Sequence, residues 1–510
     1  MRATTVFSQL IPLLSVFTSA VLSAGLPKKI HGVNLGSWLV LEAWMLPQEW
    51  QDMGGQHCND CSTCIATEFA FAQAYPKTVD KIFDGHWTTW FNQADVDALV
   101  DAGINTVRIP LGYWIIEALV DRRTEFYPRG GLKHLRRGLQ QLNKAGIVAI
   151  LDHHALPGPY LDFLDQLDFF RTRCTSSPQF YTDYNYHRAL VWTSIMTVLS
   201  HVDPAFANVV SIEAVNEPIM DATQTPGYGD FQKNFVKVIR ATEFLLGVPT
   251  PGLGSTPAPN NGNFTAMLPQ VNQPIFTAEI RAALLEAFPI LLQLGVVGLS
   301  KKRTQLVTNF MDVNWQYNDP ANPADAAIGP QGYDNHLYYV FGGVADANPE
   351  AYMRHICNLD RVQNDAALGN SPLWFGEWGL PVQFNTTDDF LRMWGDAQKM
   401  AYSKGAGWIF WNFKIEKSEL AGDLSREWSY LDGVRNGLLT KDPSKYFNPN
   451  VCDPYIGPAS STAPPESSTT PASSSTSDVP ASTTTTVSAE PSSAEVSTAV
   501  AATPSSSTSA

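Results

Sequence analysis

Short apolar runs alternate with segments of helical periodicity between residues 26 and 457. This alternation is typical of domains in which helices connect parallel strands. Eight runs have the character of buried strands: Ile30 to Leu35, Ile104 to Ile109, Ile147 to Asp152, Val209 to Val215, Gln305 to Met311, Gly332 to Tyr338, Leu373 to Glu377 and Gly407 to Trp411. Helical spacing is clear in Gln93 to Ala102, Leu132 to Ala145 and Asp230 to Leu246. The pattern predicts an α/β fold, a (β/α)8 TIM barrel with loop insertions.

One insertion lies between Val248 and Gln273, a stretch rich in Pro, Gly and Asn. It contains the glycosylation sequon Asn263-Phe264-Thr265, and a second sequon begins at Asn385. We expect an exposed loop that carries an N-glycan.

The two ends of the chain differ in composition from this central region. Residues 1–24 combine Arg2 with an apolar stretch and end in Ser23 and Ala24, which is the pattern of a secretory signal peptide. An uncleaved anchor is the alternative, but it needs about 20 apolar residues, and polar residues interrupt this stretch. We therefore expect a secreted protein, extracellular or associated with a cell wall, with one folded domain over residues 25–457.

Residues 458–510 are rich in Ser, Thr, Pro and Ala and contain no Lys, Arg or aromatic residue. Such a segment cannot form a core, and its hydroxyl groups favour an O-glycosylated, disordered stalk. An inert disordered tail is the alternative. A lipid-anchor signal needs a terminal hydrophobic stretch of about 10 to 20 residues, so we expect no membrane anchor after signal cleavage.

The six cysteines are Cys58, Cys61, Cys64, Cys174, Cys357 and Cys452. An even number in an exported chain predicts disulfide bonds, and sequence alone leaves the connectivity open. The close spacing of the first three suggests a metal cluster as the alternative, but three neighbouring thiols are one short of a four-cysteine site.

The formal net charge is −15, and the longest basic run is Lys301-Lys302-Arg303. A polyanion would be repelled, which argues against nucleic acid as a partner. A neutral polysaccharide would not be repelled. No heptad pattern predicts assembly, so we expect a monomer.

Polar and aromatic residues cluster at the predicted strand ends, the side on which barrel enzymes carry their active sites. Taken singly, each has an ordinary structural role as an alternative, such as a buried ion pair or core packing. Their joint placement favours a site. These residues are Arg108 at the end of the second strand, His153 and His154 on the third, Asn216 and Glu217 on the fourth, His336 and Tyr338 on the sixth, Glu377 on the seventh and Trp411 on the eighth.

Glu217 and Glu377 each end an apolar run, where an unpaired charge is too costly for a core. Two such carboxylates favour glycoside hydrolysis, with retention or inversion set by their separation. Arg108 and Tyr338 are placed to keep Glu377 ionised, which suits a nucleophile. Glu217, facing that anion, is expected to hold a proton and to act first as acid and then as base.

The chain resembles glycoside hydrolase family 5, and within it the fungal β-glucanases related to exo-β-1,3-glucanase and endo-β-1,6-glucanase. The resemblance spans nearly all of residues 28–440. The segments that carry it are His31 to Glu42, Val107 to Trp114, Val215 to Pro218, His336 to Tyr338, Gly376 to Gly379 and Gly407 to Trp411.

This resemblance implies roles for the candidate residues. Glu217 is then the acid/base and Glu377 the nucleophile, while Asn216 bonds the sugar 2-hydroxyl and Trp411 lies under the sugar at the cleavage point. The supporting residues would be Arg108, His154, His336 and Tyr338. Glu42 matches an acidic residue that contacts the terminal sugar, with a surface carboxylate as the alternative.

Two departures from the exo-β-1,3-glucanase pattern affect the expected specificity. This chain has Asp152-His153-His154-Ala155 where those enzymes show an Asp-Leu-His-Gly type run, and Ala43 replaces a usual Pro. The segment from Gly112 to Gly131, and the Cys-rich stretch before it, look more like the β-1,6-glucanase relatives. The sequence therefore does not decide which glucan linkage is cleaved, or whether attack is endo or exo, since loops shape the cleft.

The leading hypothesis is a secreted, retaining β-glucan hydrolase without metal or other cofactor. A non-catalytic glucan-binding wall protein is an alternative of a different class, although such a protein would have no need of both glutamates. A family 5 cellulase or mannanase is a further alternative.

Overall fold

The computed structural model describes residues 25–58, 63–158, 179–254, 268–296, 304–315 and 328–457. The predicted signal peptide at residues 1–24, the predicted stalk at residues 458–510 and the sequon at Asn263 lie outside these ranges. Within the described ranges, no helix is long and apolar enough to cross a lipid bilayer.

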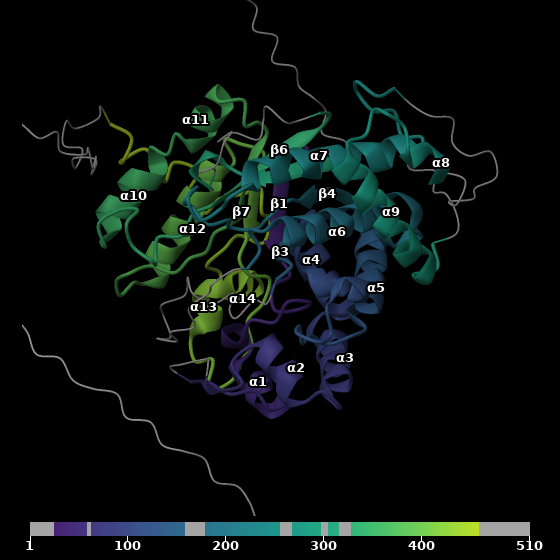
Figure 1. Cartoon of the computed structure of the whole chain (residues 1–510). Coiled ribbons are helices and arrows are strands. Elements are labelled where there is room, and N and C mark those ends of the chain that lie inside the picture. Colours follow the sequence, from purple (N-terminus) through teal and green to yellow (C-terminus); the bar gives the residue numbers. More distant parts are fainter. Residues whose placement is uncertain are drawn as a thin grey trace, which may run out of the picture. The chain divides into compact units, whose positions relative to one another are not determined.

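Eight parallel strands close into a barrel in chain order, and Figure 1 shows the helices that lie around the strands. The strands are β1 (Ile30–Asn34), β2 (Thr106–Gly112), β3 (Val148–Ala155), β4 (Val209–Glu213), β5 (Val307–Met311), β6 (Gln331–His336), β7 (Leu373–Glu377) and β8 (Gly407–Phe410). The ring closes where β8 pairs with β1. The predicted TIM barrel is confirmed, and every strand overlaps the run that was predicted for it.

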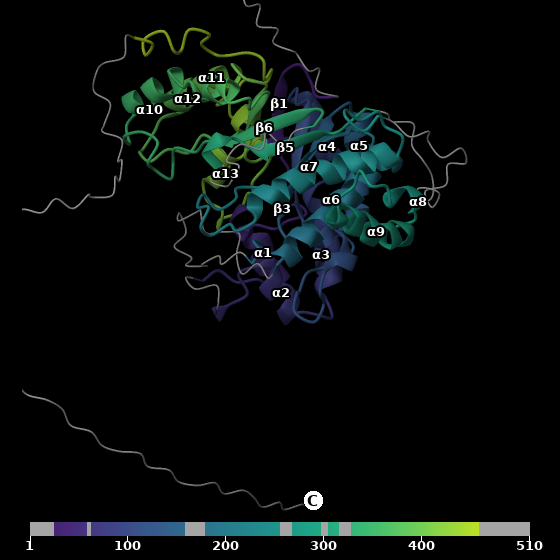
Figure 2. The same cartoon turned by 45° about the horizontal axis from the view of Figure 1, so that its top comes forward.

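Helices surround the barrel. They are α1 (Pro47–Met53), α2 (Glu68–Ala74), α3 (Val79–Trp90), α4 (Gln93–Asp101), α5 (Gly131–Lys144), α6 (Asp183–Val202), α7 (Tyr228–Leu245), α8 (Leu268–Val271), α9 (Ala278–Gln293), α10 (Pro349–Cys357), α11 (Arg361–Ala367), α12 (Asp388–Tyr402), α13 (Leu424–Trp428) and α14 (Tyr430–Arg435). α6 packs against α7 and α9, and α10 packs against α12. Figure 2 shows these two groups on different sides of the barrel. The three helices predicted from periodicity correspond to α4, α5 and α7.

The inside of the barrel holds an apolar layer and a polar layer. The apolar layer, near the amino ends of the strands, consists of Ile30, Ile150, Val307, Trp374 and Ile409. Gly332 leaves room for Trp374, because a Cβ at position 332 would lie 2.3 Å from the indole. The next layer toward the carboxyl ends is buried and polar, and it consists of Asn34, Arg108, Asp152, Glu213 and Asp334. This polar layer forms the floor of the candidate site.

Two disulfide bonds join described cysteines. Cys58 bonds to Cys64 across a short loop, and Cys357 at the end of α10 bonds to Cys452, 95 residues further along the chain. The prediction of disulfides is confirmed for these four residues. Since Cys58 and Cys64 are bonded to each other, the alternative of a cluster of metal-binding thiols is wrong for this pair. Cys61 and Cys174 lie outside the described residues.

Candidate active site

The structure brings the predicted site residues together at the carboxyl ends of the strands. His154 is the second-last residue of β3, His336 is the last residue of β6 and Glu377 is the last residue of β7. The others lie in or beside the loops that follow strands: Glu42 after β1, Asn216 and Glu217 after β4, Tyr338 after β6 and Trp411 after β8.

Several expected positions were wrong in detail. Asn216, Glu217 and Trp411 do not end strands, because β4 stops at Glu213 and β8 at Phe410. Arg108 does not end β2, because the strand continues to Gly112 and pairs with β3 along that length. The side chain of Arg108 therefore rises from within the barrel. Tyr338 does not end β6, which stops at His336.

Only one of the two neighbouring histidines enters the site. His153 is buried outside the barrel, where its ring stacks on Trp192 of α6 with centroids 4.0 Å apart. His154 points inward, and its Nδ1 lies 2.6 Å from Oδ2 of Asp152. The pleat of the strand separates the two, since successive side chains point to opposite faces.

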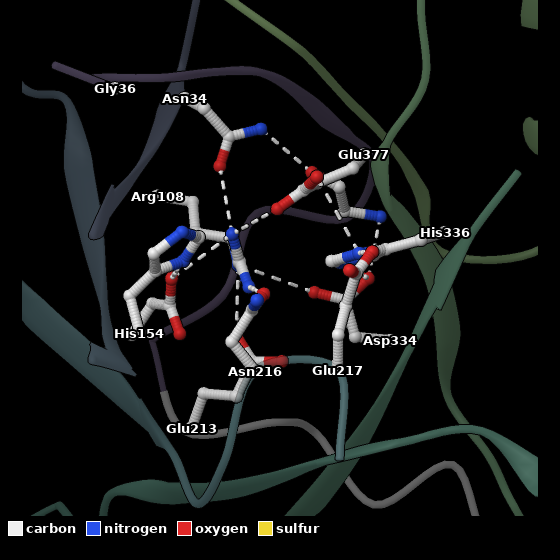
Figure 3. Close-up of polar contacts among 12 residues, drawn as sticks. Asn34, Gly36, Arg108, His154, Glu213, Asn216, Glu217, Asp334, His336 and Glu377 are labelled. Atoms are coloured by element: carbon white, nitrogen blue, oxygen red, sulfur yellow. Dashed lines mark hydrogen bonds and ion pairs between the residues drawn. The ribbon is translucent and has the colours of Figure 1, made fainter. Parts of the chain in front are cut away.

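Glu217 and Glu377 face each other across His336, as Figure 3 shows. Nδ1 of His336 lies 2.7 Å from Oε1 of Glu217 and 3.5 Å from Oε2 of Glu377. One oxygen of each carboxylate and one ring nitrogen of His336 all lie within 4.8 Å of one another. Carboxyl groups this close share a proton readily, because ionising both at once is costly.

The two carboxylates differ in their hydrogen-bond donors. Nη1 of Arg108 donates to Oε1 of Glu377 at 2.9 Å, and the hydroxyl of Tyr338 donates to Oε2 at 2.9 Å. Glu217 instead contacts His336. Because a cation and a hydroxyl both stabilise the anion at Glu377, the shared proton belongs on Glu217.

Burial raises the pKa of Glu217 to about 7, although the charge on Arg108 limits the rise. Burial also raises the pKa of Glu377 to about 7, an effect that Arg108 limits and the neighbouring Glu217 increases. Burial lowers the pKa of His336 to about 4, which keeps its ring neutral near pH 7. The pair therefore titrates close to neutrality, where an acid and a base are both useful.

Arg108 is fully buried and contacts carboxylates on several strands. Its Nε donates to Glu213 at 2.8 Å, and its Nη1 lies 3.1 Å from Asp152. Nη2 donates to Oδ1 of Asn216 at 2.7 Å. Burial opposes the charged form, but the carboxylates of Asp152 and Glu213 raise the pKa of Arg108 well above its ordinary value. The site therefore has a permanent positive charge at its floor.

The backbone of Glu217 is strained. Its φ of 39° lies in the left-handed region, which a residue with a side chain rarely adopts. Such strain is concentrated at functional sites, where the surrounding structure maintains it. The strained backbone therefore indicates that the Glu217 carboxylate is held in a fixed position in the site.

The rim of the site carries a buried acid and aromatic rings. Glu42 is 5% exposed and accepts a hydrogen bond from Nε1 of Trp44 at 2.9 Å. Burial raises its pKa to about 8, with a further rise from the charges of Glu377 and Glu217. The alternative of a surface carboxylate is therefore wrong. Trp411 lies nearly parallel to the ring of His154, with centroids 5.8 Å apart.

The sequence analysis did not identify several residues of the site. Four of them belong to the polar layer. Another is Trp315, which packs against His336 with ring centroids 6.1 Å apart. Counting back in twos from His154 and His336 would have found Asp152 and Asp334, because inward positions recur every second residue. The missed polar residues are Asn34, Asp152, Glu213 and Asp334.

The atoms of Glu217, His336 and Glu377 are of the kinds that bind Zn²⁺. Arg108 and Tyr338 already donate to both oxygens of Glu377, however. Protein groups thus satisfy this carboxylate, and the arrangement suits proton transfer and nucleophilic attack.

The sequence matches the family model "Cellulase (glycosyl hydrolase family 5)" over residues 72–417. It is 31% identical to Glucan endo-1,6-beta-glucosidase B of Emericella nidulans, over 85% of this chain and 91% of that protein. It is 31% identical to Glucan 1,3-beta-glucosidase of Blumeria graminis over 38% of this chain and 41% of that protein. Among solved structures, rutinosidase from Aspergillus niger superimposes with a TM-score of 0.51 at 18% identity, covering 80% of this chain and 97% of that one, which indicates a shared fold.

Proposed function

The chain belongs to glycosyl hydrolase family 5, and on that premise we propose that it is a secreted enzyme that hydrolyses β-glucan with retention of configuration. The resemblance to this family predicted from the sequence is thereby confirmed. The carboxylate pair carries the mechanistic proposal. Retaining enzymes hold their carboxyl groups about 5–5.5 Å apart, and inverting enzymes about 6.5–9.5 Å apart. The separation of 4.8 Å or less between oxygens of Glu217 and Glu377 supports retention.

In the first step, Glu377 attacks the anomeric carbon while Glu217 gives its proton to the departing glycosidic oxygen. The bond to the leaving sugar breaks as a glycosyl ester forms on Glu377. Esterification removes the negative charge of Glu377, so the pKa of Glu217 falls and this residue becomes a base. Glu217 then takes a proton from water, which attacks the same carbon and releases Glu377.

The surrounding residues fit the binding of a neutral sugar. Arg108 donates to Oδ1 of Asn216, which turns the amide N–H group of Asn216 to the other side, toward a sugar 2-hydroxyl. Trp411 offers an apolar face beside His154. Buried Glu42, with a raised pKa, is placed to bond a hydroxyl of the sugar.

We propose β-1,6-glucan as the preferred substrate and β-1,3-glucan as the alternative. The relatives named glucan endo-1,6-beta-glucosidase B match 80–85% of the chain. The relatives named 1,3-beta-glucosidases match 38–41% of it. A non-catalytic binding role is less well supported, because Glu377 keeps both an arginine and a tyrosine as donors.

Secretion is part of the proposal. The signal-like residues 1–24 and the Ser/Thr-rich residues 458–510 support an exported, O-glycosylated protein. Disulfides persist mainly in oxidising compartments, so Cys58–Cys64 and Cys357–Cys452 support the same route. Asn385 is exposed, as an N-glycan acceptor must be.

The test is product release from purified protein on pustulan, a β-1,6-glucan, and laminarin, a β-1,3-glucan. We expect faster release from pustulan, no activity in Glu377→Ala, and a β-anomer as the first product seen by ¹H NMR. A first product of α configuration would overturn retention. Folded, inactive wild-type protein on both polymers would overturn β-glucan hydrolysis.

A further inference from the structure

The alternation of side chains along β7 does not by itself place Glu377 in the site. Trp374 lies in the apolar layer inside the barrel, while Phe375 stacks on a tyrosine of α12 outside it. Because side chains alternate between the faces of a strand, a regular β7 would put Gly376 inside and Glu377 outside. Glu377 nevertheless contacts Arg108 inside the barrel.

An irregular step in the ladder between β6 and β7 accounts for this reversal. Asn335 pairs with Phe375 and the next residue, His336, pairs with Glu377, so Gly376 is passed over. An extra residue of this kind turns the following side chain to the opposite face. The direction of Glu377 therefore depends on how the backbone of Gly376 is held.

Side chains from two other strands hold both backbone groups of Gly376. Its N–H donates to Oδ1 of Asp334 on β6 at 2.6 Å, and its carbonyl accepts from Nδ2 of Asn34 on β1 at 2.8 Å. We call Asn34 and Asp334 the Gly376 clamp. Both residues also lie beside Arg108, as Figure 3 shows: Oδ1 of Asn34 is 3.1 Å from Nη1 and Oδ2 of Asp334 is 3.6 Å from Nε.

The clamp requires glycine at position 376. A Cβ at this position would lie 2.0 Å from Oδ2 and 2.1 Å from Oδ1 of Asp334. The carboxyl group therefore packs directly against the Cα of Gly376. An alanine there would displace Asp334 and the hydrogen bond together.

We propose that Asp334, with Asn34, is a positioning residue that turns Glu377 toward the substrate by fixing the bulged Gly376. This inference rests on the proposed role of Glu377 as nucleophile. Asp334 is fully buried in the floor of the site, so it acts through Gly376. Burial and the neighbouring Glu213 raise the pKa of Asp334 well above its ordinary value, so the group acts as a hydrogen-bond acceptor without needing its charge.

The experiment compares kcat and KM on pustulan, and on laminarin if that is the better substrate, for Asp334→Ala and Asp334→Asn. A misplacement of about 1 Å costs about 100-fold in rate, so we expect kcat of Asp334→Ala to fall about 100-fold with little change in KM. Asparagine keeps an oxygen at the same place, so Asp334→Asn is expected to restore kcat to within about tenfold of wild type.

Asp365→Ala is the matched control. Asp365 is also fully buried and also accepts a backbone N–H, that of Val313, but it does not touch Gly376. We expect this variant to lose thermal stability while it keeps the wild-type kcat. Wild-type kcat in Asp334→Ala would overturn the proposal, as would an Asp334→Asn variant as impaired as Asp334→Ala.

Two further measurements cover the remaining outcomes. If Asp334→Ala does not fold, Asn34→Ala tests the clamp from the other side and should give the same loss of kcat. If wild-type protein cleaves no glucan, the proposed function fails, and crystal structures of the folded variants decide the positioning role alone. Loss of the Glu377–Arg108 contact would support the clamp, and an unmoved Glu377 would refute it.

Discussion

Removing the hydroxyl of Tyr338 is the most specific way to perturb the proposed nucleophile, Glu377. Tyr338→Phe removes its hydrogen bond to Oε2 of Glu377. The ring would still pack against Phe341 and Trp428, whose centroids both lie 5.6 Å from it. The substitution therefore tests one hydrogen bond with little change in packing.

The expected size follows from the charge of the acceptor. A hydrogen bond to a charged group contributes about 1.5–3 kcal/mol, and one pKa unit corresponds to about 1.4 kcal/mol. The bond stabilises the anion, so its loss raises the pKa of Glu377 from its value of about 7. The acidic limb of the kcat/KM profile should move up by about 1–2 pH units. Below that limb, kcat/KM should fall about 10-fold to 100-fold.

The assay is the pH dependence of kcat/KM on the preferred glucan. Tyr339→Phe is the control, because the neighbouring hydroxyl contacts His355, away from the site. We expect its profile to match that of wild type. An unchanged acidic limb in Tyr338→Phe would refute the reasoning, and so would an equal shift in both variants.

Three other substitutions test separate features. Glu217→Gln should still form the glycosyl-enzyme from an activated aryl β-glucoside but hydrolyse it slowly, so the intact ester should appear in mass spectra; its absence would contradict the acid/base role. Replacing Cys357 and Cys452 together by serine should lower stability by about 2–5 kcal/mol because the bond closes a long loop, and an unchanged Tm by calorimetry would contradict this. His153→Leu should raise stability by about 1–2 kcal/mol at unchanged kcat, since neither ring nitrogen has a hydrogen-bond partner among the described residues; a lower Tm would count against it.

The sequence predicted the barrel and brought most site residues to the right face because strand ends are visible as ends of apolar runs. Glu217 and Glu377 stood out for that reason. Asp334 did not, because a carboxyl inside a strand is recognised only by counting back along the strand from a site residue such as His336. For Glu42 the sequence left a surface carboxylate open as the alternative to a sugar contact, and only the folded loop shows that the side chain is buried.

Disulfide pairing was also beyond reach of spacing alone. Cys58 bonds to Cys64, although Cys61 is nearer in the sequence, and Cys357 bonds to a residue 95 positions away. Both pairings depend on where loops come to lie after folding. The irregular step at Gly376 could not be predicted either, because it depends on how β6 pairs with β7. Its only trace in the sequence is a glycine.

The extra residue in β7 limits how natural or engineered variants can change length here. Deleting Gly376 would restore a regular ladder in which Glu377 directly follows Phe375, still pairs with His336 and still faces the inside of the barrel. The deletion would, however, remove the two backbone groups that Asp334 and Asn34 hold. The length of β7 is therefore constrained by the contacts of one glycine and not by the alternation of faces, whereas loops a few positions away tolerate changes of length.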